Sequence, residues 1–291
     1  MIKQILKLIR VHHWVKNLAI FLPVFFSGRL LEVLFDHSIY KAIILFFAFS
    51  LTSSLIYILN DALDVEKDRL HPEKKNRPLA SGYFSIKQAV AIALFLFVLS
   101  VSLIYSLDDS KWFVIGYFVL NVLYAFILKN IAIIDVICIS IGFLIRILAG
   151  GLILGIVVSK WMIIIVFLLS MSIGFAKRRD DLTIQNGVTL RKSQSGYTTA
   201  FIDIAKSICF SVTLMAYILY TISEEVIARV GTDKLYITSL PVFIGIMRYL
   251  QISLVENKSG SPIKILSRDV FLQATLLVWL MLFAYFIYFQ K

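Results

Sequence analysis

The sequence predicts an all-α integral membrane protein with nine transmembrane helices, and three observations lead to this class. Hydrophobic residues make up 59% of the 291 residues and charged residues only 16%, whereas a soluble domain carries roughly 25% charged residues. Nine apolar segments approach the length of about 20 residues that crosses a bilayer as a helix. Most basic residues lie between these segments. Because an open strand would leave backbone groups unpaired in lipid, every crossing is expected to be a helix.

These features exclude a disordered chain, a secreted disulfide scaffold and an ordinary soluble enzyme, and they do not indicate nucleic-acid binding. Cys138 and Cys209 lie in apolar segments, so we expect buried thiols and no disulfide. The four histidines never fall at i, i+4 on a helix with a carboxylate, so a histidine-based zinc site is not expected. The N-terminal stretch is basic and amphipathic and lacks a small-residue cleavage site. We interpret 1–291 as one transmembrane domain.

The nine segments follow one another along most of the chain. They are 17–35, 39–59, 86–106, 111–128, 131–154, 160–176, 204–222, 235–252 and 270–289. The eighth is the weakest, because it contains Pro241 and Arg248.

The distribution of Lys and Arg predicts the orientation. Twenty of the 29 basic residues fall on the side of the N-terminus and seven on the other, while Arg146 and Arg248 lie within segments. Basic residues accumulate on the cytoplasmic side. We therefore expect a protein of the plasma (inner) membrane, with its N-terminus in the cytoplasm and its C-terminus outside. The two long charged loops, 60–87 and 177–203, are then cytoplasmic and are the expected active-site loops.

The first loop opens with a cluster of acids. Asp61, Asp64 and Asp68, preceded by Asn60, are spaced i, i+3, i+7, which places the three carboxylates on one helical face. Such carboxylates repel one another unless cations neutralise them, and oxygen ligands of this kind suit Mg²⁺ together with substrate phosphates. The alternative is a solvated acidic turn that is paired with Lys67 and Arg69. We expect a magnesium site, because acids at the end of a transmembrane helix are costly.

Basic residues continue the same loop. Arg69, Lys75 and Arg77 follow the acids closely and make a plausible metal–diphosphate clamp, since Arg binds phosphate in a bidentate manner. The alternative role for such cations is topology and contact with anionic lipid.

The second loop again combines both signs of charge. Lys177 and Asp181 are i, i+4 neighbours, and Arg178 lies between them. Further on, Arg191, Lys192 and Tyr197 add donors for phosphate. Two loops of this composition suggest one polyphosphate held between them, against the alternative of an ordinary loop with local ion pairs.

Two charges lie within the fifth segment. Asp135 and Arg146 are 11 residues apart, about 16 Å along a helix, so they cannot pair directly. An ionisable residue at this depth is by default a functional candidate, and each should face a polar cavity or another helix. Gly150 and Gly151 are expected to serve close helix packing.

The acidic motif resembles the first aspartate motif of the UbiA superfamily of intramembrane prenyltransferases. That resemblance implies nine helices around a cavity open to the cytoplasmic side, with Mg²⁺ on a diphosphate. The chain is most similar to the branch that transfers phosphoribose to decaprenyl phosphate. The similar positions are Trp14-Val15-Lys16-Asn17, Asp68-Arg69-x-His71-Pro72 through Arg77-Pro78, Asp135-Val136 through Arg146 to Gly151, Lys177-Arg178-x-x-Asp181, and Arg191-Lys192-Ser193 with Tyr197-Thr198. One departure is that the second aspartate motif usual in prenyltransferases is basic here, with adjacent Asp180 and Asp181.

The resemblance implies Mg²⁺-dependent transfer of 5-phosphoribose from phosphoribosyl diphosphate to a polyprenyl phosphate. Asp61, Asp64 and Asp68 would hold the metal beside the leaving diphosphate, and Lys177, Arg178, Arg191, Lys192 and Tyr197 would bind the donor. Lys16 and Asn17 are candidates for the lipid phosphate, while Arg69, Lys75 and Arg77 could serve either substrate. The nucleophile is already anionic near neutral pH, so no general base is needed. The expected partners are these two substrates and membrane lipids, and a homo-oligomer is left open.

Two other functions remain as alternatives. The first is UbiA-type transfer of a prenyl group from a prenyl diphosphate to an aromatic or lipid acceptor. The second is a transporter or lipid-carrier-binding protein, which is disfavoured because the chain has no matched midplane site in two halves.

Overall fold

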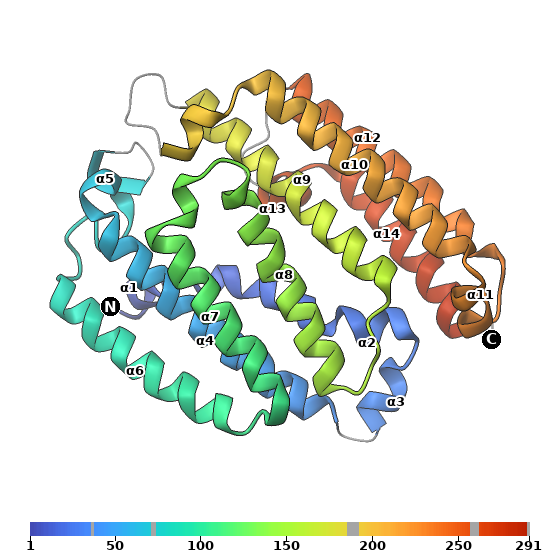
Figure 1. Ribbon diagram of the computed structural model, residues 1–291, viewed down its shortest axis with the longest axis horizontal. Helices are drawn as coiled ribbons and strands as arrows, with labels where there is room; N and C mark the ends of the chain where they lie inside the picture. The colour runs from blue at the N-terminus through green and yellow to red at the C-terminus, as the bar shows by residue number, and fades with distance from the viewer. Residues whose placement is uncertain (36–37, 71–73, 185–191, 257–261, 290–291) are drawn as a thin grey trace. The chain divides into compact units, whose positions relative to one another are not determined.

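The described part of the chain is helical throughout, with no strand. The computed structural model describes residues 1–35, 38–70, 74–184, 192–256 and 262–289 (Figure 1). Its α-helices are α1 (Ile2–Leu8), α2 (Leu22–Ser27), α3 (Leu30–Phe35), α4 (Ile39–Leu63), α5 (Val65–Leu70), α6 (Ile86–Tyr105), α7 (Lys111–Phe126), α8 (Ile134–Ile153), α9 (Lys160–Ile184), α10 (Thr199–Ile222), α11 (Glu224–Val230), α12 (Ser239–Leu254), α13 (Pro262–Arg268) and α14 (Val270–Ala284). Short 3-10 helices join them at η1 (Val11–Phe21), η2 (Lys74–Asn76), η3 (Asp108–Ser110), η4 (Leu128–Asn130), η5 (Lys192–Gly196) and η6 (Lys234–Thr238), and a π-helical stretch, η7 (Tyr285–Phe289), follows α14.

Seven helices among the described residues are long and apolar enough to cross a membrane. They are Ile39–Leu63, Ile86–Tyr105, Ile134–Ile153, Lys160–Leu182, Thr199–Ile222, Lys234–Leu254 and Val270–Phe289. Each corresponds to one of the nine predicted segments. Many large apolar side chains on these helices are exposed, for example Leu94, Phe95 and Val98 at 61%, 64% and 65%. An apolar surface of this kind is suited to lipid rather than to water.

The remaining two segments differ from the predicted long helices. The segment 17–35 is divided among η1, α2 and α3, because Gly28 at φ 75° ends α2 and residue 29 precedes a new helix. Pro23 lies in the first turn of α2, where its missing N–H breaks no helical hydrogen bond. The segment 111–128 contains α7, a continuous helix of 16 residues. The predicted count of nine crossings is therefore not confirmed.

The chain divides into two compact units. Among the described residues, unit 1 comprises those of 1–131 and 142–158, and unit 2 comprises those of 132–141, 159–184 and 192–289. Helix α8 contributes its first part to unit 2 and its remainder to unit 1.

Unit 1 is built around α4. This helix packs against η1, α6 and α7, and its buried face joins Leu45, Phe49 and Ile56 to Ile20 of η1 and Val114 of α7. Several buried hydroxyls also lie on α4. The Thr52 hydroxyl is 2.8 Å from that of Ser100 on α6, and hydrogen bonds of this kind link helices within a membrane.

Unit 2 is built from paired helices. Helix α10 packs against α9 and α12, and α12 packs against α14 (Figure 1). Phe175 and Ala176 of α9 contribute to two separate apolar clusters, one with Tyr197 and Ile202 and one with Phe210 and further residues. Arg248, which weakened the eighth predicted segment, is paired with Asp269 at the start of α14 at 2.6 Å.

Candidate functional site

The three acids of the first motif lie at a break between two helices. Asp61 is in the last turn of α4, Asp64 follows its end with φ −103° and ψ 10°, and Asp68 lies in α5. The expectation of one continuous helical face is therefore wrong. The backbone leaves the helical conformation at Asp64, and the carboxylate of Asp64 meets a different cation from the one that Asp61 and Asp68 share.

Arg77 lies between two of these carboxylates. Its Nη1 donates to Asp61 Oδ1 at 3.0 Å and to Asp68 Oδ2 at 2.5 Å. Asp61, which is 3% exposed, also forms an ion pair with Arg10 at the start of η1. Burial lowers the pKa of the Arg10 guanidinium, and Asp61 opposes this shift. Arg77 belongs to the predicted phosphate clamp, and its contacts therefore link that clamp to the acids.

Asp64 is held by a cation from another part of unit 1. Both of its carboxylate oxygens accept from Lys129 Nζ, at 3.1 and 3.0 Å. The alternative of pairing with Lys67 and Arg69 does not describe this cluster, because Arg69 donates to Glu66 at 2.9 Å. Sequence reasoning missed Arg10 and Lys129 as partners, since they lie 51 and 65 residues from the acids they contact.

The donor chemistry at this break fits Mg²⁺. The ion takes oxygen ligands and is commonly bound by one or two carboxylates plus substrate phosphates. Asp61 and Asp68 present carboxylate oxygens to a single nitrogen of Arg77, so a cationic group already lies between them. Within the described ranges no set of three His, Cys, Asp or Glu side chains is close enough together to hold a metal by itself. The residues suit a metal that is also held by substrate.

The other predicted residues of this loop are spread out. Asn60 is half-buried in the last turn of α4, and its carbonyl accepts the Asp64 N–H at 3.0 Å. Arg69 reaches Ala80 O at 3.4 Å, whereas Lys75 is exposed in η2. His71, at the centre of the matching motif, lies outside the described residues.

A second polar cluster lies in unit 2 around Asp135. This carboxylate is fully buried and accepts from Arg178 Nε at 2.5 Å and from the Tyr197 hydroxyl at 2.6 Å. The Tyr197 hydroxyl also accepts the Ile133 N–H at 2.5 Å. Burial and the hydrogen bond to Asp135 raise the pKa of Tyr197. Two predicted donor-binding residues, Arg178 and Tyr197, are therefore engaged inside the protein, where they fix the segment before α10.

The rest of the second motif lies beside this cluster. Asp181 Oδ2 accepts from Arg178 Nη1 at 3.2 Å, and Lys177 is exposed on the same helix. Arg191 and the side chain of Lys192 lie outside the described residues.

A third cluster surrounds Arg146 in unit 1. Its Nε donates to Asn17 Oδ1 at 2.6 Å, and its Nη2 donates to the Tyr117 hydroxyl at 2.9 Å. Asn17 is 1% exposed and also donates to Ser50 Oγ at 2.9 Å. As predicted, Arg146 and Asp135 do not pair with each other. Sequence reasoning missed Tyr117, because a tyrosine in an apolar run carries no distinguishing signal.

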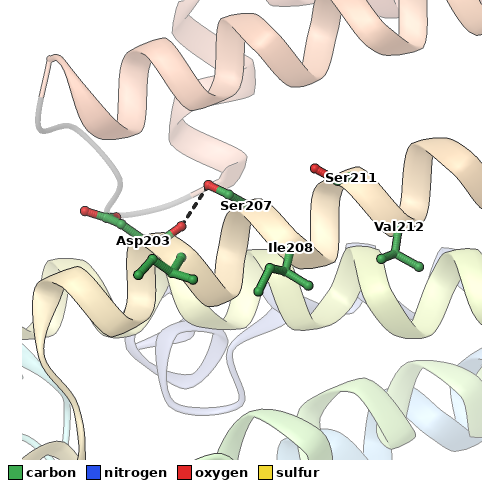
Figure 2. Close-up of a pocket in the computed structure, with 6 residues that line it drawn as sticks. Asp203, Ser207, Ile208, Ser211 and Val212 are labelled. Carbon is green, nitrogen blue, oxygen red and sulfur yellow. Dashed lines mark hydrogen bonds between the residues drawn. The ribbon is translucent and has the colours of Figure 1, made fainter.

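An open hollow of about 490 Å³ lies elsewhere, along α10. Figure 2 shows polar and apolar side chains of this helix in alternation, and the lining residues are Asp203, Ile204, Ser207, Ile208, Ser211 and Val212. Asp203 accepts from Arg179 at 2.8 Å and from Lys206 at 3.1 Å. None of the predicted site residues lines this hollow.

Comparison with known proteins agrees with the motifs. Residues 21–272 match the UbiA prenyltransferase family. The chain is 29% identical to decaprenyl-phosphate phosphoribosyltransferase of Mycolicibacterium smegmatis, over 100% of this chain and 94% of that protein. It is also 29% identical to the enzyme of that name from Corynebacterium glutamicum, over 94% of this chain and 83% of that protein.

Solved structures share the fold. A UbiA homolog from Archaeoglobus fulgidus bound to GPP and Mg²⁺ superposes with a TM-score of 0.69 and 16% identity, over 97% of this chain and 98% of that one. The long apolar helices and this family match together describe a multi-pass membrane enzyme of the prenyl-transferase type. The chain belongs to the UbiA prenyltransferase family.

Proposed function

We propose that this protein transfers 5-phosphoribose from phosphoribosyl diphosphate to a polyprenyl phosphate and releases diphosphate. The observation that carries the proposal is the similarity, over the full chain, to proteins named decaprenyl-phosphate phosphoribosyltransferase. The basic character of 177–179, where prenyltransferases usually have a second aspartate motif, supports a donor with more phosphate groups.

The reaction is a substitution at C1 of ribose. An oxygen of the lipid phosphate forms a bond to C1, and the bond from C1 to the diphosphate oxygen breaks, with the electron pair leaving on diphosphate. The phosphate monoester has a second pKa near 6, so it is anionic near neutral pH and needs no general base. The ring oxygen stabilises the positive charge that develops at C1.

For unit 1, the proposal assigns the metal and leaving-group chemistry to the acidic break. Asp61, Asp68 and Asp64, with Asn60, would hold Mg²⁺, which when bound neutralises charge on diphosphate. Arg77, which contacts Asp61 and Asp68, is assigned to the leaving diphosphate. Lys16 and Asn17 are assigned to the acceptor side.

For unit 2, the proposal assigns donor phosphates to Lys177, Arg191 and Lys192. Arg178 and Tyr197, which contact the buried Asp135, position this segment. Asp181 would act through Arg178, its neighbour at 3.2 Å.

The rival within the family is transfer of a prenyl group from a prenyl diphosphate. One observation favours it: the shared fold extends to UbiA homologs solved with GPP and with DMAPP. In that reaction the prenyl diphosphate is the donor, and the acceptor is an aromatic or lipid molecule.

A single assay separates the two reactions. The purified full chain is incubated with Mg²⁺, labelled phosphoribosyl diphosphate and polyprenyl phosphate, and separately with a prenyl diphosphate and an aromatic acceptor. We expect a labelled lipid in the first mixture only. Asp61→Asn should lose this activity and remain folded, whereas Asp109→Asn, an exposed acid of η3, should keep it. Turnover of prenyl diphosphate with no labelled phosphoribosyl lipid would replace the proposal by its rival.

A further inference from the structure

Arg10 contacts the acidic break from outside the two motif loops. It lies between α1 and η1, and its guanidinium forms an ion pair with Asp61, the most buried of the three acids. The guanidinium carbon also lies 4.8 Å from the centre of the Tyr57 ring, on the same helix as Asp61. The side chain of Arg10 is only 15% exposed, so water screens this pair less than it screens a surface pair.

The backbone of Arg10 is held in an unfavourable conformation. Its φ of 52° and ψ of 48° lie in the left-handed region, which costs a residue with a Cβ roughly 1–2 kcal/mol. Two hydrogen bonds fix the chain there: Ser54 Oγ donates to Ile9 O at 2.7 Å, and the His13 N–H donates to Arg10 O at 2.8 Å. From this conformation the side chain reaches Asp61. A strained residue in contact with a candidate site is a reason to look for a role at that site.

The cations of the acidic break balance its acids. Arg10, Arg77 and Lys129 form ion pairs with the three aspartates of the motif, so three positive charges meet three negative ones among the described residues. A cluster of carboxylates attracts a divalent cation through negative charge that is not otherwise compensated. These ion pairs leave no such surplus. A metal ion that approaches without substrate therefore has to compete with cations of the chain itself.

At Asp61 the competing cation is Arg10. We infer that Arg10 lowers the affinity of the acidic break for a divalent metal alone, so that the metal is bound together with the diphosphate of the donor. Diphosphate adds negative charge, which offsets the cations, and it supplies further oxygen ligands for the metal. The inference rests on the proposed function, because it requires a donor that carries diphosphate. Arg10 acts through Asp61 and is a positioning residue.

The test measures metal binding rather than turnover. The full chain in phosphatidylcholine nanodiscs is dialysed to equilibrium against Mn²⁺, which stands in for Mg²⁺, with and without inorganic diphosphate. The excess of Mn²⁺ on the protein side, corrected with empty nanodiscs, gives the Kd. We expect diphosphate to lower the Kd of the wild-type protein for Mn²⁺. Arg10→Gln should lower the Kd for Mn²⁺ alone by about 10-fold or more, because it removes a shielded positive charge beside a metal ligand. The further effect of diphosphate should then be smaller than in the wild type.

Matched variants separate the charge of Arg10 from its effect on folding. Arg10→Lys keeps the charge and should bind Mn²⁺ as the wild type does. Arg10→Gly removes the charge but suits the left-handed backbone, so it should tighten Mn²⁺ binding even where Arg10→Gln folds poorly. Adding Asp61→Asn to Arg10→Gln should abolish the gain. Lys7→Gln removes an exposed lysine of α1 and should leave the Kd unchanged.

The inference is wrong if neither neutral variant of Arg10 binds Mn²⁺ more tightly, or if diphosphate does not lower the Kd of the wild type. It is also wrong if Arg10→Lys or Lys7→Gln has the same effect as Arg10→Gln. Phosphoribosyl transfer by an enzyme whose metal affinity does not depend on Arg10 would leave the proposed function standing without this inference. Tighter Mn²⁺ binding in the neutral variants, with prenyl transfer in place of phosphoribosyl transfer, would contradict the proposed function only, because a prenyl diphosphate has the same leaving group.

Discussion

At the scale of single residues, the acids of the first motif are neutralised by cations from distant parts of the chain. The spacing of Asp61, Asp64 and Asp68 marks a charged cluster at a helix end, and adjacent carboxylates require cations. The cations that supply this need, Arg10 and Lys129, lie 51 and 65 residues away in sequence. Nothing in a single sequence reports contacts over such separations. The sequence predicts that Arg77 binds phosphate. Its contacts with Asp61 and Asp68 are seen only in the structure.

Removing Arg77 should expose its role between the carboxylates. Arg77→Gln leaves Asp61 and Asp68 with less positive charge, so we expect the free energy of unfolding without metal to fall by about 1–3 kcal/mol. We also expect Mg²⁺ alone to raise the melting temperature of this variant more than that of the wild-type protein. The measurement is thermal unfolding in detergent with EDTA and with Mg²⁺.

The matched control for this variant is Lys75→Gln, an exposed residue of the same loop. Its response to Mg²⁺ should equal that of the wild type. An Arg77→Gln protein whose melting temperature does not change with Mg²⁺ would contradict the assignment of a metal to Asp61 and Asp68.

At the scale of elements, seven of the nine predicted segments became long helices, because an apolar run of about 20 residues has few alternatives in a membrane. The segment 17–35 differs from the predicted single helix because average hydropathy does not indicate where a helix ends. Gly28, between Ser27 and Arg29, takes a positive φ and ends α2 inside a segment that is apolar on average. The prediction of close helix packing is confirmed for Gly150, which lies against η1, whereas Gly151 lies against Ile156 and Val158 in the connection that follows α8.

At Gly150, α8 lies close against the backbone of η1. A Cβ there would lie 2.0 Å from the carbonyl oxygen of Ile20, and a backbone atom cannot rotate away. We expect Gly150→Ala to lower stability by about 1–3 kcal/mol or more, as overpacking does. Because Asn17 is one turn before Ile20, binding of the polyprenyl phosphate, which the proposed function assigns to Lys16 and Asn17, should weaken as well.

The control for this substitution is Gly116→Ala on α7, where a Cβ meets nothing within 4 Å. It should be neutral or stabilising by up to about 1 kcal/mol, since Ala is the better helix former. The measurement is the melting temperature of both variants and of the wild type in thermal unfolding. Equal melting temperatures for Gly150→Ala and the wild type would show that η1 does not lie against α8 as described.

The pairing of α12 with α14 gives a pH-dependent contribution to stability. The Arg248 guanidinium, at 2.6 Å, and the Leu272 N–H hold the pKa of Asp269 below its usual value. A carboxyl whose folded-state pKa is lowered stabilises the fold above its unfolded pKa of about 3.9, and this contribution is lost as the pH falls through the folded value. Asp269→Asn should therefore melt below the wild type at pH 7, and the difference should shrink as the pH falls below about 4. For Asp109→Asn, the exposed control, we expect no difference at either pH.

At the scale of the whole molecule, the sequence supports a membrane enzyme of the UbiA family and leaves the number of crossings to be measured. The charge asymmetry predicts which side each connection occupies, because positive loops are retained in the cytoplasm. It cannot decide whether a marginal segment crosses. Whether such a segment crosses depends on how η1, α2 and α7 pack. Their packing is determined by contacts between residues that are far apart in the sequence.

Single cysteines introduced at four exposed positions determine the crossings. We expect Ile2, Ser81 and Ile131 to share the cytoplasmic side and Asp109 to face outward. Two predicted crossings separate Ile2 from Ser81, one separates Ser81 from Asp109, and one separates Asp109 from Ile131. An impermeant maleimide applied to intact cells should then label only Asp109→Cys, and lysed cells should label all four. Cys138 and Cys209 are buried, so their background is low. If 17–35 does not cross, Ile2 and Ser81 will be labelled from opposite sides. If 111–128 does not cross, Asp109 and Ile131 will be labelled from the same side, and the orientation of every later loop will reverse.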